Sequence, residues 1–337
     1  TTIGTSADTY AANYLGYLLG GGLKTKLPSI TSDSVTAVDA NTYTPTSAPA
    51  EADIGTLVSS TINGRAEYSA ITDNADASSD VTISPAFSGS SYTTVRNMQT
   101  WYVPGRTATG SREHSLAFRI DGVSFRSFAY GCVLESLSIT LDNGRLMADL
   151  VYQSALIQDD HGNAVGPIEP VYNSGAAQLF RGAYVVASST SPTSLTNATT
   201  GDKLARTALQ AEDFSLTLTN TLTPLGHSND ILAMSDMDIT DVTVELSLTL
   251  SSPASLVADD FFNRTVRQIL VGTGPQGDGL GCAIMLPAAM LTVDPSAFDV
   301  SGNDIVRQQL TYSQSRFGGD VVETNAGNSP FRLGLGI

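Results

Sequence analysis

The sequence predicts a mainly β protein made of two related β-sandwich or barrel-like domains with one flanking helix. Only 15% of the 337 residues are charged, and Ser and Thr supply much of the polarity, which favours sheet surfaces over charged helices. Residues 133–141 and 242–250 both alternate apolar side chains with small polar ones, and Leu-Ser-Ile-Thr-Leu in the first is matched by Leu-Ser-Leu-Thr-Leu in the second. Successive side chains of a strand point to opposite faces, so each stretch can face both a core and water. The repeated strand indicates two related domains.

The N-terminal region predicts an extended arm rather than a domain. Residues 1–22 contain a short helical stripe of Tyr and Leu that ends at three consecutive glycines. Residues 28–55 are rich in Ser, Thr, Ala and Pro and have little hydrophobic period, which is typical of an extended segment. We assign residues 1–55 to this arm. In an assembling protein such an arm often lies on a neighbouring subunit, and a flexible terminus is the equally open alternative.

The first β domain is expected over residues 56–200. Its predicted strands cover residues 62–70, 80–87, 114–121, 124–141, 145–156 and 178–187. Asp142, Asn143 and Gly144 separate the two long strands of this set, and Asn-Gly is a strong signal for a tight hairpin. A loop rich in Ser, Thr and Asn over residues 188–203 places the domain boundary near residue 200.

The second β domain is expected over residues 201–337 and contains the main helix. Ser252 is a candidate N-cap, and Pro253 suits the first helical position. An apolar stripe then predicts a helix over residues 253–270, with Gly272 placed to end it. The predicted strands cover residues 214–220, 238–251, 281–292, 304–317 and 331–337.

The long strands each have one polar face. Alternation places small polar or charged side chains opposite an apolar row in the hairpin and in the second copy of the repeated strand. These polar-face residues are Ser136, Ser138, Thr140, Arg145, Asp149, Gln153, Thr243, Glu245, Ser247 and Thr249. Any half-exposed antiparallel strand has this pattern, so alternation alone leaves open what the polar face meets.

The order of these elements resembles the tail tube proteins, or major tail proteins, of long-tailed bacterial and archaeal viruses, in a two-domain form. The resemblance covers roughly residues 113–317 by pattern and order rather than by an invariant signature, and it does not extend to residues 1–110. The segments that carry it are residues 130–153, 214–220, 241–250, the helix with Phe261 and Phe262, and residues 281–287 and 304–312.

The resemblance implies a structural virion protein that acts by self-assembly and not as an enzyme. Members of the family fold as a β-sandwich flanked by a helix and form rings that stack into a hollow tube, in which long strands of all subunits join one barrel around the lumen. The tube holds a tape-measure protein and conducts DNA to the host without binding it specifically. Two such domains in one chain imply a trimeric ring with pseudo-sixfold symmetry, with a hexamer as the alternative. The ten polar-face residues are then the candidates for the lumen wall.

Composition excludes some other classes of protein. The formal net charge is −16, and Lys occurs only at positions 24, 26 and 203, so a basic groove that grips nucleic-acid phosphates is not expected. The acidity either lets DNA pass without sticking or only keeps the protein soluble, for example in a saline habitat. Cys132 and Cys282 are far apart in apolar contexts and predict buried free thiols. We expect a soluble chain made in a host cytoplasm, without a signal peptide or a membrane helix.

Motifs for metal, cofactor or catalytic chemistry are weak. The glycine-rich stretch 272–279 lacks the Lys-Ser or Lys-Thr of a phosphate loop. Asp159, Asp160 and His161 read as a solvated turn, and the aspartates at 236–241 lack the Gly and Glu of a calcium loop. We therefore expect no metal, no cofactor and no catalytic residue. Two alternatives stay open: another viral β protein, such as a capsid-decorating or tail-terminator subunit, and a surface adhesin or carbohydrate-binding module.

Overall fold

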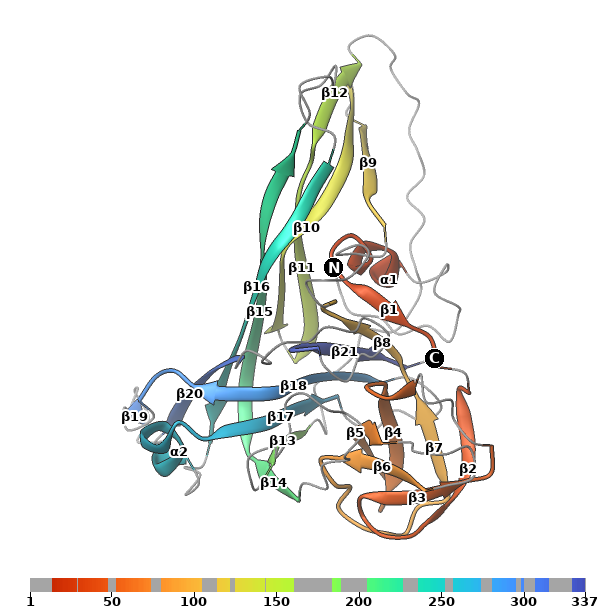
Figure 1. Cartoon of the computed structure of the whole chain (residues 1–337). Helices are drawn as coiled ribbons and strands as arrows, with labels where there is room; N and C mark the ends of the chain where they lie inside the picture. The colour runs from red at the N-terminus through yellow and green to blue at the C-terminus, as the bar shows by residue number, and fades with distance from the viewer. Residues whose placement is uncertain are drawn as a thin grey trace.

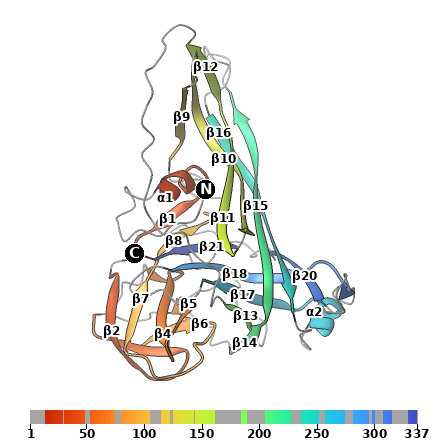
Figure 2. The same ribbon diagram turned by 180° about the vertical axis from the view of Figure 1, so that it is seen from behind.

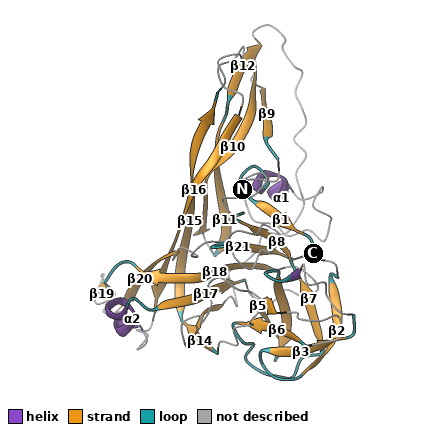
Figure 3. Ribbon diagram, in the orientation of Figure 1, coloured by secondary structure: helices purple, strands orange, loops and turns teal. Residues whose placement is uncertain are grey.

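The fold is known from a computed structural model. It describes residues 14–28, 30–47, 53–73, 80–104, 114–121, 125–142, 144–160, 184–188, 205–226, 236–251, 257–273, 281–294, 298–299, 307–314 and 329–336. Within these ranges the chain forms 21 strands and two helices, α1 (Tyr14–Leu19) and α2 (Val257–Asn263). Figure 3 shows that strands make up nearly all of the regular structure, so the predicted mainly β class is confirmed.

Six short strands near the N-terminus form a closed barrel in the order β2-β3-β6-β5-β4-β7. They are β2 (Ser32–Ala37), β3 (Thr42–Pro45), β4 (Leu57–Ile62), β5 (Arg65–Asp73), β6 (Val81–Ser84) and β7 (Thr94–Asn97). The barrel has its own core, which includes Val35, Tyr43, Ile71, Ile83 and Phe87. Closing the sheet removes its exposed edges.

The expectation of an extended arm over residues 1–55 is wrong for the described part of that region. β2 and β3 belong to the barrel, and β1 (Lys24–Lys26) pairs with β8 (Gln99–Tyr102) of the main sheet. The physical reason is that β2 and β3 are short and bury few apolar side chains, among them Val35 and Tyr43. Strands this short do not show a hydrophobic period in the sequence.

All remaining strands belong to one sheet of 15 strands, whose main order is β1-β8-β21-β18-β20-β16-β15-β10-β11. The long upright strands, which we call the mast, are β9 (Leu116–Asp121), β10 (Arg126–Asp142), β11 (Arg145–Gln153), β12 (Leu156–Asp160), β15 (Ala211–Leu225) and β16 (Asp236–Leu250). The others, which we call the base, are β1, β8, β13 (Tyr184–Ser188), β14 (Arg206–Leu209), β17 (Val266–Gly272), β18 (Cys282–Leu291), β19 (Phe298–Asp299), β20 (Arg307–Gln314) and β21 (Arg332–Leu335). Figures 1 and 2 show the base strands crossing the foot of the mast, with the barrel below them.

The predicted boundary near residue 200 does not separate two cores. β10 pairs with β15 across that boundary, and one hydrophobic core contains Leu137 and Leu146 together with Leu216, Leu246 and Ile284. The two copies of the repeated strand lie in β10 and β16, which flank β15 in the same sheet. Alternation identified both strands correctly, but it carries no information about which sheet a strand joins.

The hairpin predicted at residues 142–144 is confirmed. Asp142 of β10 lies opposite Arg145 of β11, and Gly144 has a φ of 73°, the left-handed conformation that Gly adopts without strain. Above this hairpin β10 changes partners at Gly131, where φ is 61°. Its lower part pairs with β11 and β15, while its upper part pairs with β9 and β12.

The helix predicted over residues 253–270 is wrong in its second half. α2 ends at Asn263, Arg264 has a φ of 51°, and β17 begins at Val266. The later residues of the predicted apolar stripe, Val266, Ile269 and Leu270, pair instead with strands β13 and β18. A short run of apolar, β-branched residues fits either period, and long-range pairing selects the strand.

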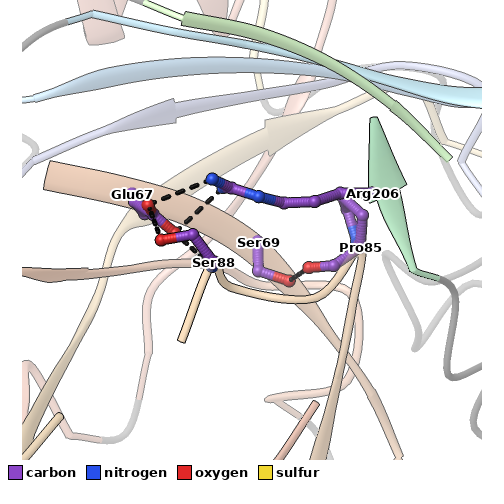
Figure 4. Close-up of polar contacts among 5 residues, drawn as sticks. All are labelled: Glu67, Ser69, Pro85, Ser88 and Arg206. Atoms are coloured by element: carbon purple, nitrogen blue, oxygen red, sulfur yellow. Dashed lines mark hydrogen bonds and ion pairs between the residues drawn. The ribbon is translucent and has the colours of Figure 1, made fainter. Parts of the chain in front are cut away.

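The barrel docks on the base through a shared apolar layer and buried polar contacts. Leu57, Tyr68 and Met98 of the barrel side pack against Leu270 and Met285 of the base. The Tyr68 hydroxyl donates to the Thr273 carbonyl at 2.8 Å, and the Ser84 hydroxyl donates to the Gln268 side-chain oxygen at 2.8 Å. Figure 4 shows a further contact, in which the Arg206 guanidinium of β14 makes two hydrogen bonds to the carboxylate of Glu67 in β5.

The same junction buries part of a lysine. The Lys26 ammonium donates to the Ile54 carbonyl at 3.1 Å. Burial lowers the pKa of Lys26 from 10.5 to about 8; the charge of Arg332 also lowers this pKa, and the charge of Asp53 opposes both effects. Because burial makes folded Lys26 lose its proton at a lower pH than unfolded Lys26, the unfolded chain binds more protons from about pH 8 to about pH 10.

The stability contributed at Lys26 is therefore expected to rise with pH from about pH 8 to about pH 10 and to be flat below that window. The Lys26→Met variant should lack this rise, since it has no amine to titrate. The measurement is urea unfolding of both proteins at several pH values in this window. The tyrosines and cysteines titrate in both proteins, so the difference between the two curves reports Lys26. A difference that does not change with pH would contradict the expectation.

Candidate functional site

We call β11, β15, β16 and the part of β10 that pairs with β11 (residues 133–142) the lower mast. Its polar face is the candidate functional site. β11, β10, β15 and β16 are adjacent and antiparallel, and directly opposed residues of such strands share a face. One row across all four strands consists of Asp149, Ser138, Thr217 and Glu245. The neighbouring rows are Val151, Ser136, Thr219 and Thr243 on one side, and Met147, Thr140, Ser215 and Ser247 on the other.

All ten predicted polar-face residues lie on this one face. Seven of them are in the three rows; Arg145 and Gln153 follow the same alternation in β11, and Thr249 lies opposite Asp213 at the lower end of β16. Sequence reasoning missed the contribution of β15, which supplies Ser215, Thr217 and Thr219. The signal was present, because Phe-Ser-Leu-Thr-Leu-Thr over residues 214–219 has the same alternation. The sequence does not show that this segment shares the polar face, because β15 and β10 come from the two different expected domains.

The opposite face of these strands is built into the main core. Leu137, Ile139, Leu218, Val244 and Leu246 are all fully buried. The pattern break at residue 134, visible in the sequence, has a structural cause, since the register of β10 against β11 shifts between Leu134 and Ser136. This β-bulge turns Leu134 towards the core, where it is fully buried.

The polar face consists mainly of neutral hydroxyl groups open to solvent. Thr217, Thr219 and Thr243 are exposed, and Ser136 and Ser138 are half-buried. Two hydroxyls of this face contact neighbouring strands only at long range: Ser247 Oγ lies 3.5 Å from Thr311 Oγ1, and Thr243 Oγ1 lies 3.5 Å from the Thr219 carbonyl. Bonds of this length hold the side chains weakly, so the face can exchange hydrogen bonds with water.

The charges on this face are mostly negative. Over residues 136–153, 213–221 and 241–249 the charged side chains that share it are Arg145, Asp142, Asp149, Asp213, Asp241 and Glu245. One cation against five acids cannot form the clustered basic surface that holds nucleic-acid phosphates. The arrangement instead repels a polyanion that lies close to the face.

The other residues that the sequence offered as metal ligands, phosphate-binding groups or reactive thiols form no reactive site among the described residues. Asp159 lies in β12 and accepts a hydrogen bond from the Ser127 hydroxyl at 2.7 Å, while His161 and the glycine-rich residues 274–280 lie outside the described residues. Among the described residues no group of three His, Cys, Asp or Glu side chains is placed to hold a metal ion. Cys132 and Cys282 are buried free thiols, as predicted, and burial raises the pKa of the Cys282 thiol to about 12.

Comparison with known proteins assigns no family to this chain. No protein-family model matches the sequence, and no curated protein matches it significantly. Neither helix in the described ranges has the length and apolar character needed to span a bilayer.

Proposed function

We propose that this chain is the tail tube subunit of a long-tailed virus. It assembles into rings that stack into a hollow tube, which holds the tape-measure protein and conducts DNA to the host. It acts in the virion by assembly and not by catalysis. The observation that carries the proposal is the lower mast: a four-stranded antiparallel sheet with one face in the core and the other covered by hydroxyls and acidic groups. Such a face suits a water-filled channel through which DNA passes without adhering.

The edges of the lower mast suit a ring. Among the described strands, β11 pairs only with β10, and residues 236–244 of β16 pair only with β15. Because the four strands alternate in direction, β11 of one copy and β16 of its neighbour in a ring run antiparallel. Edge-to-edge pairing then continues the same antiparallel sheet and covers edges that would otherwise invite uncontrolled association.

The number of strands favours six copies over three. With strands about 4.8 Å apart and tilted by about 40°, three copies give 12 strands and a backbone circle about 24 Å across, whereas six give 24 strands and about 48 Å. Side chains narrow both circles. The smaller circle leaves too little room for duplex DNA, and the larger one accommodates it. We therefore propose the hexamer, the alternative to the trimer, with each chain contributing one four-stranded wall.

Electron microscopy of the purified chain tests this proposal. After concentration, negative staining is expected to show rings of six subunits and stacked tubes with a stain-filled centre. The same protein should restore tails when supplied to a virus that lacks its own copy. Persistent monomers that also fail to restore tails would refute the function, and rings of three would refute the strand-count argument alone.

A further inference from the structure

The upper mast has an apolar face on which two isoleucine side chains are exposed. In the three-stranded sheet of β9, β10 and β12, Ala129 lies directly between Phe118 and Ile157, so these three side chains share a face. Ile120 lies on the same face two residues further along β9. Ile120 is 54% exposed and Ile157 is 63% exposed. We call these four residues the upper apolar face.

This face continues the core-facing side of the lower mast. The rings of Phe118 and Tyr152 are 5.0 Å apart, and Tyr152 packs against the main core and donates a hydrogen bond to the Leu18 carbonyl of α1 at 2.7 Å. Figure 1 shows that α1 and the base strands lie beside the lower mast, while β12 and the upper part of β10 extend beyond them. The lower half of this side is therefore covered by other elements of the chain, whereas on the upper half Ile120 and Ile157 stay exposed among the described residues.

Apart from Asp159, the charged side chains described in the upper mast lie on its other face. Asp121 accepts hydrogen bonds from Arg119 at 2.8 Å and from Arg126 at 3.2 Å. Arg126 also lies over the ring of Phe128, 5.9 Å from its centroid. Asp159 is the one described charged residue on the side of the upper apolar face, and it accepts a hydrogen bond from the Ser127 hydroxyl. An apolar partner therefore suits this face better than a charged one.

We propose that the upper apolar face docks against a second copy of this chain in the next ring. The inference rests on the proposed function, because stacking repeats the chain along the tube, in the direction in which the mast extends. The copy in the next ring then lies next to the upper apolar face, just beyond α1 and the base strands that cover the lower mast. Each copy carries a formal charge of −16, so electrostatic forces between copies are repulsive. Burial of Ile120 and Ile157 against the next copy supplies a hydrophobic attraction that opposes this repulsion.

The first test separates rings from tubes. The double variant Ile120→Asp, Ile157→Asp places two charges on the face at exposed positions, where folding is not expected to suffer. It should form rings as wild type does but should not stack them, as judged by negative-stain microscopy. Tubes of normal length from this variant would overturn the proposal.

The second test measures burial directly. The thiol of an Ile157→Cys variant should react quickly with an alkylating reagent in isolated rings and at least tenfold more slowly in tubes, while both native cysteines are buried and give a low background. The matched control is Val38→Cys, at a 55% exposed position in the barrel, which should react equally in both states. Equal reactivity of the Ile157→Cys thiol in rings and tubes would overturn the docking alone. Absence of any assembly by wild type would overturn the proposed function and the docking with it.

Discussion

Replacement of Glu67 with Ala is expected to lower the free energy of unfolding by about 3 kcal/mol, since it breaks a buried ion pair between the barrel and the base. The Glu67 carboxylate is almost completely buried; it accepts a hydrogen bond from the Ser88 backbone at 2.7 Å and another from the Ser88 hydroxyl. The Arg206 guanidinium is bound to it at 2.9 and 3.1 Å. Without Glu67, Arg206 loses this ion pair at a mostly buried position, where its side chain is only 20% exposed.

Urea unfolding followed by fluorescence of Trp101 measures this change, because Trp101 is the single tryptophan and is fully buried in the main core. The matched control is Arg307→Ala. It removes another Arg–Glu pair, with a 2.7 Å contact to Glu212, but both of these side chains are more than one-third exposed. That loss should stay below about 1 kcal/mol. Equal effects of the two substitutions would show that burial does not determine the strength of the Glu67 contact.

The parts of the structure that sequence reasoning predicted are those set by local periodicity. The hairpin at Gly144 follows from a turn that needs a positive φ, and the polar face follows from strict alternation in three long strands. The bulge after Leu134 is also visible in the sequence, as a break in the alternation of apolar and polar residues. Such features depend on neighbours in the sequence, so one sequence is enough to find them.

The parts that failed depend on contacts distant in the sequence. β17 is a strand because Leu270 pairs with Val186 and Met285, and neither contact is visible in an apolar run that also fits a helix. The barrel joins residues 32–45 to residues 57–97, with few core residues in each of the two N-terminal strands. The separation into two domains failed for the same reason, since β10 and β15 pair across the expected boundary.

Lysine substitutions on the polar face are expected to convert a wall that repels DNA into one that holds it. Ser138 lies in the row with Asp149 and Glu245, and Ser247 lies one row lower. Replacing both with Lys puts two cations beside these acids in every copy, and the ring symmetry repeats them around the channel. The flanking core residues are unchanged, so rings and tubes should still form. Ejection of DNA should slow by at least about tenfold, because each phosphate that a Lys neutralises adds a favourable ionic contact.

The salt dependence makes this prediction specific to a lumen. Contacts between Lys and phosphate weaken steeply as salt concentration rises, so high salt should restore the ejection rate of the Ser138→Lys, Ser247→Lys virions towards that of wild type. The matched control is Thr36→Lys, an exposed position on the barrel opposite Thr44, which adds a cation away from the mast. It should leave ejection unchanged at all salt concentrations. If the double variant forms normal tubes and ejects DNA at the wild-type rate in low salt, the polar face does not line the channel, and the hydroxyl rows of the mast only meet bulk water.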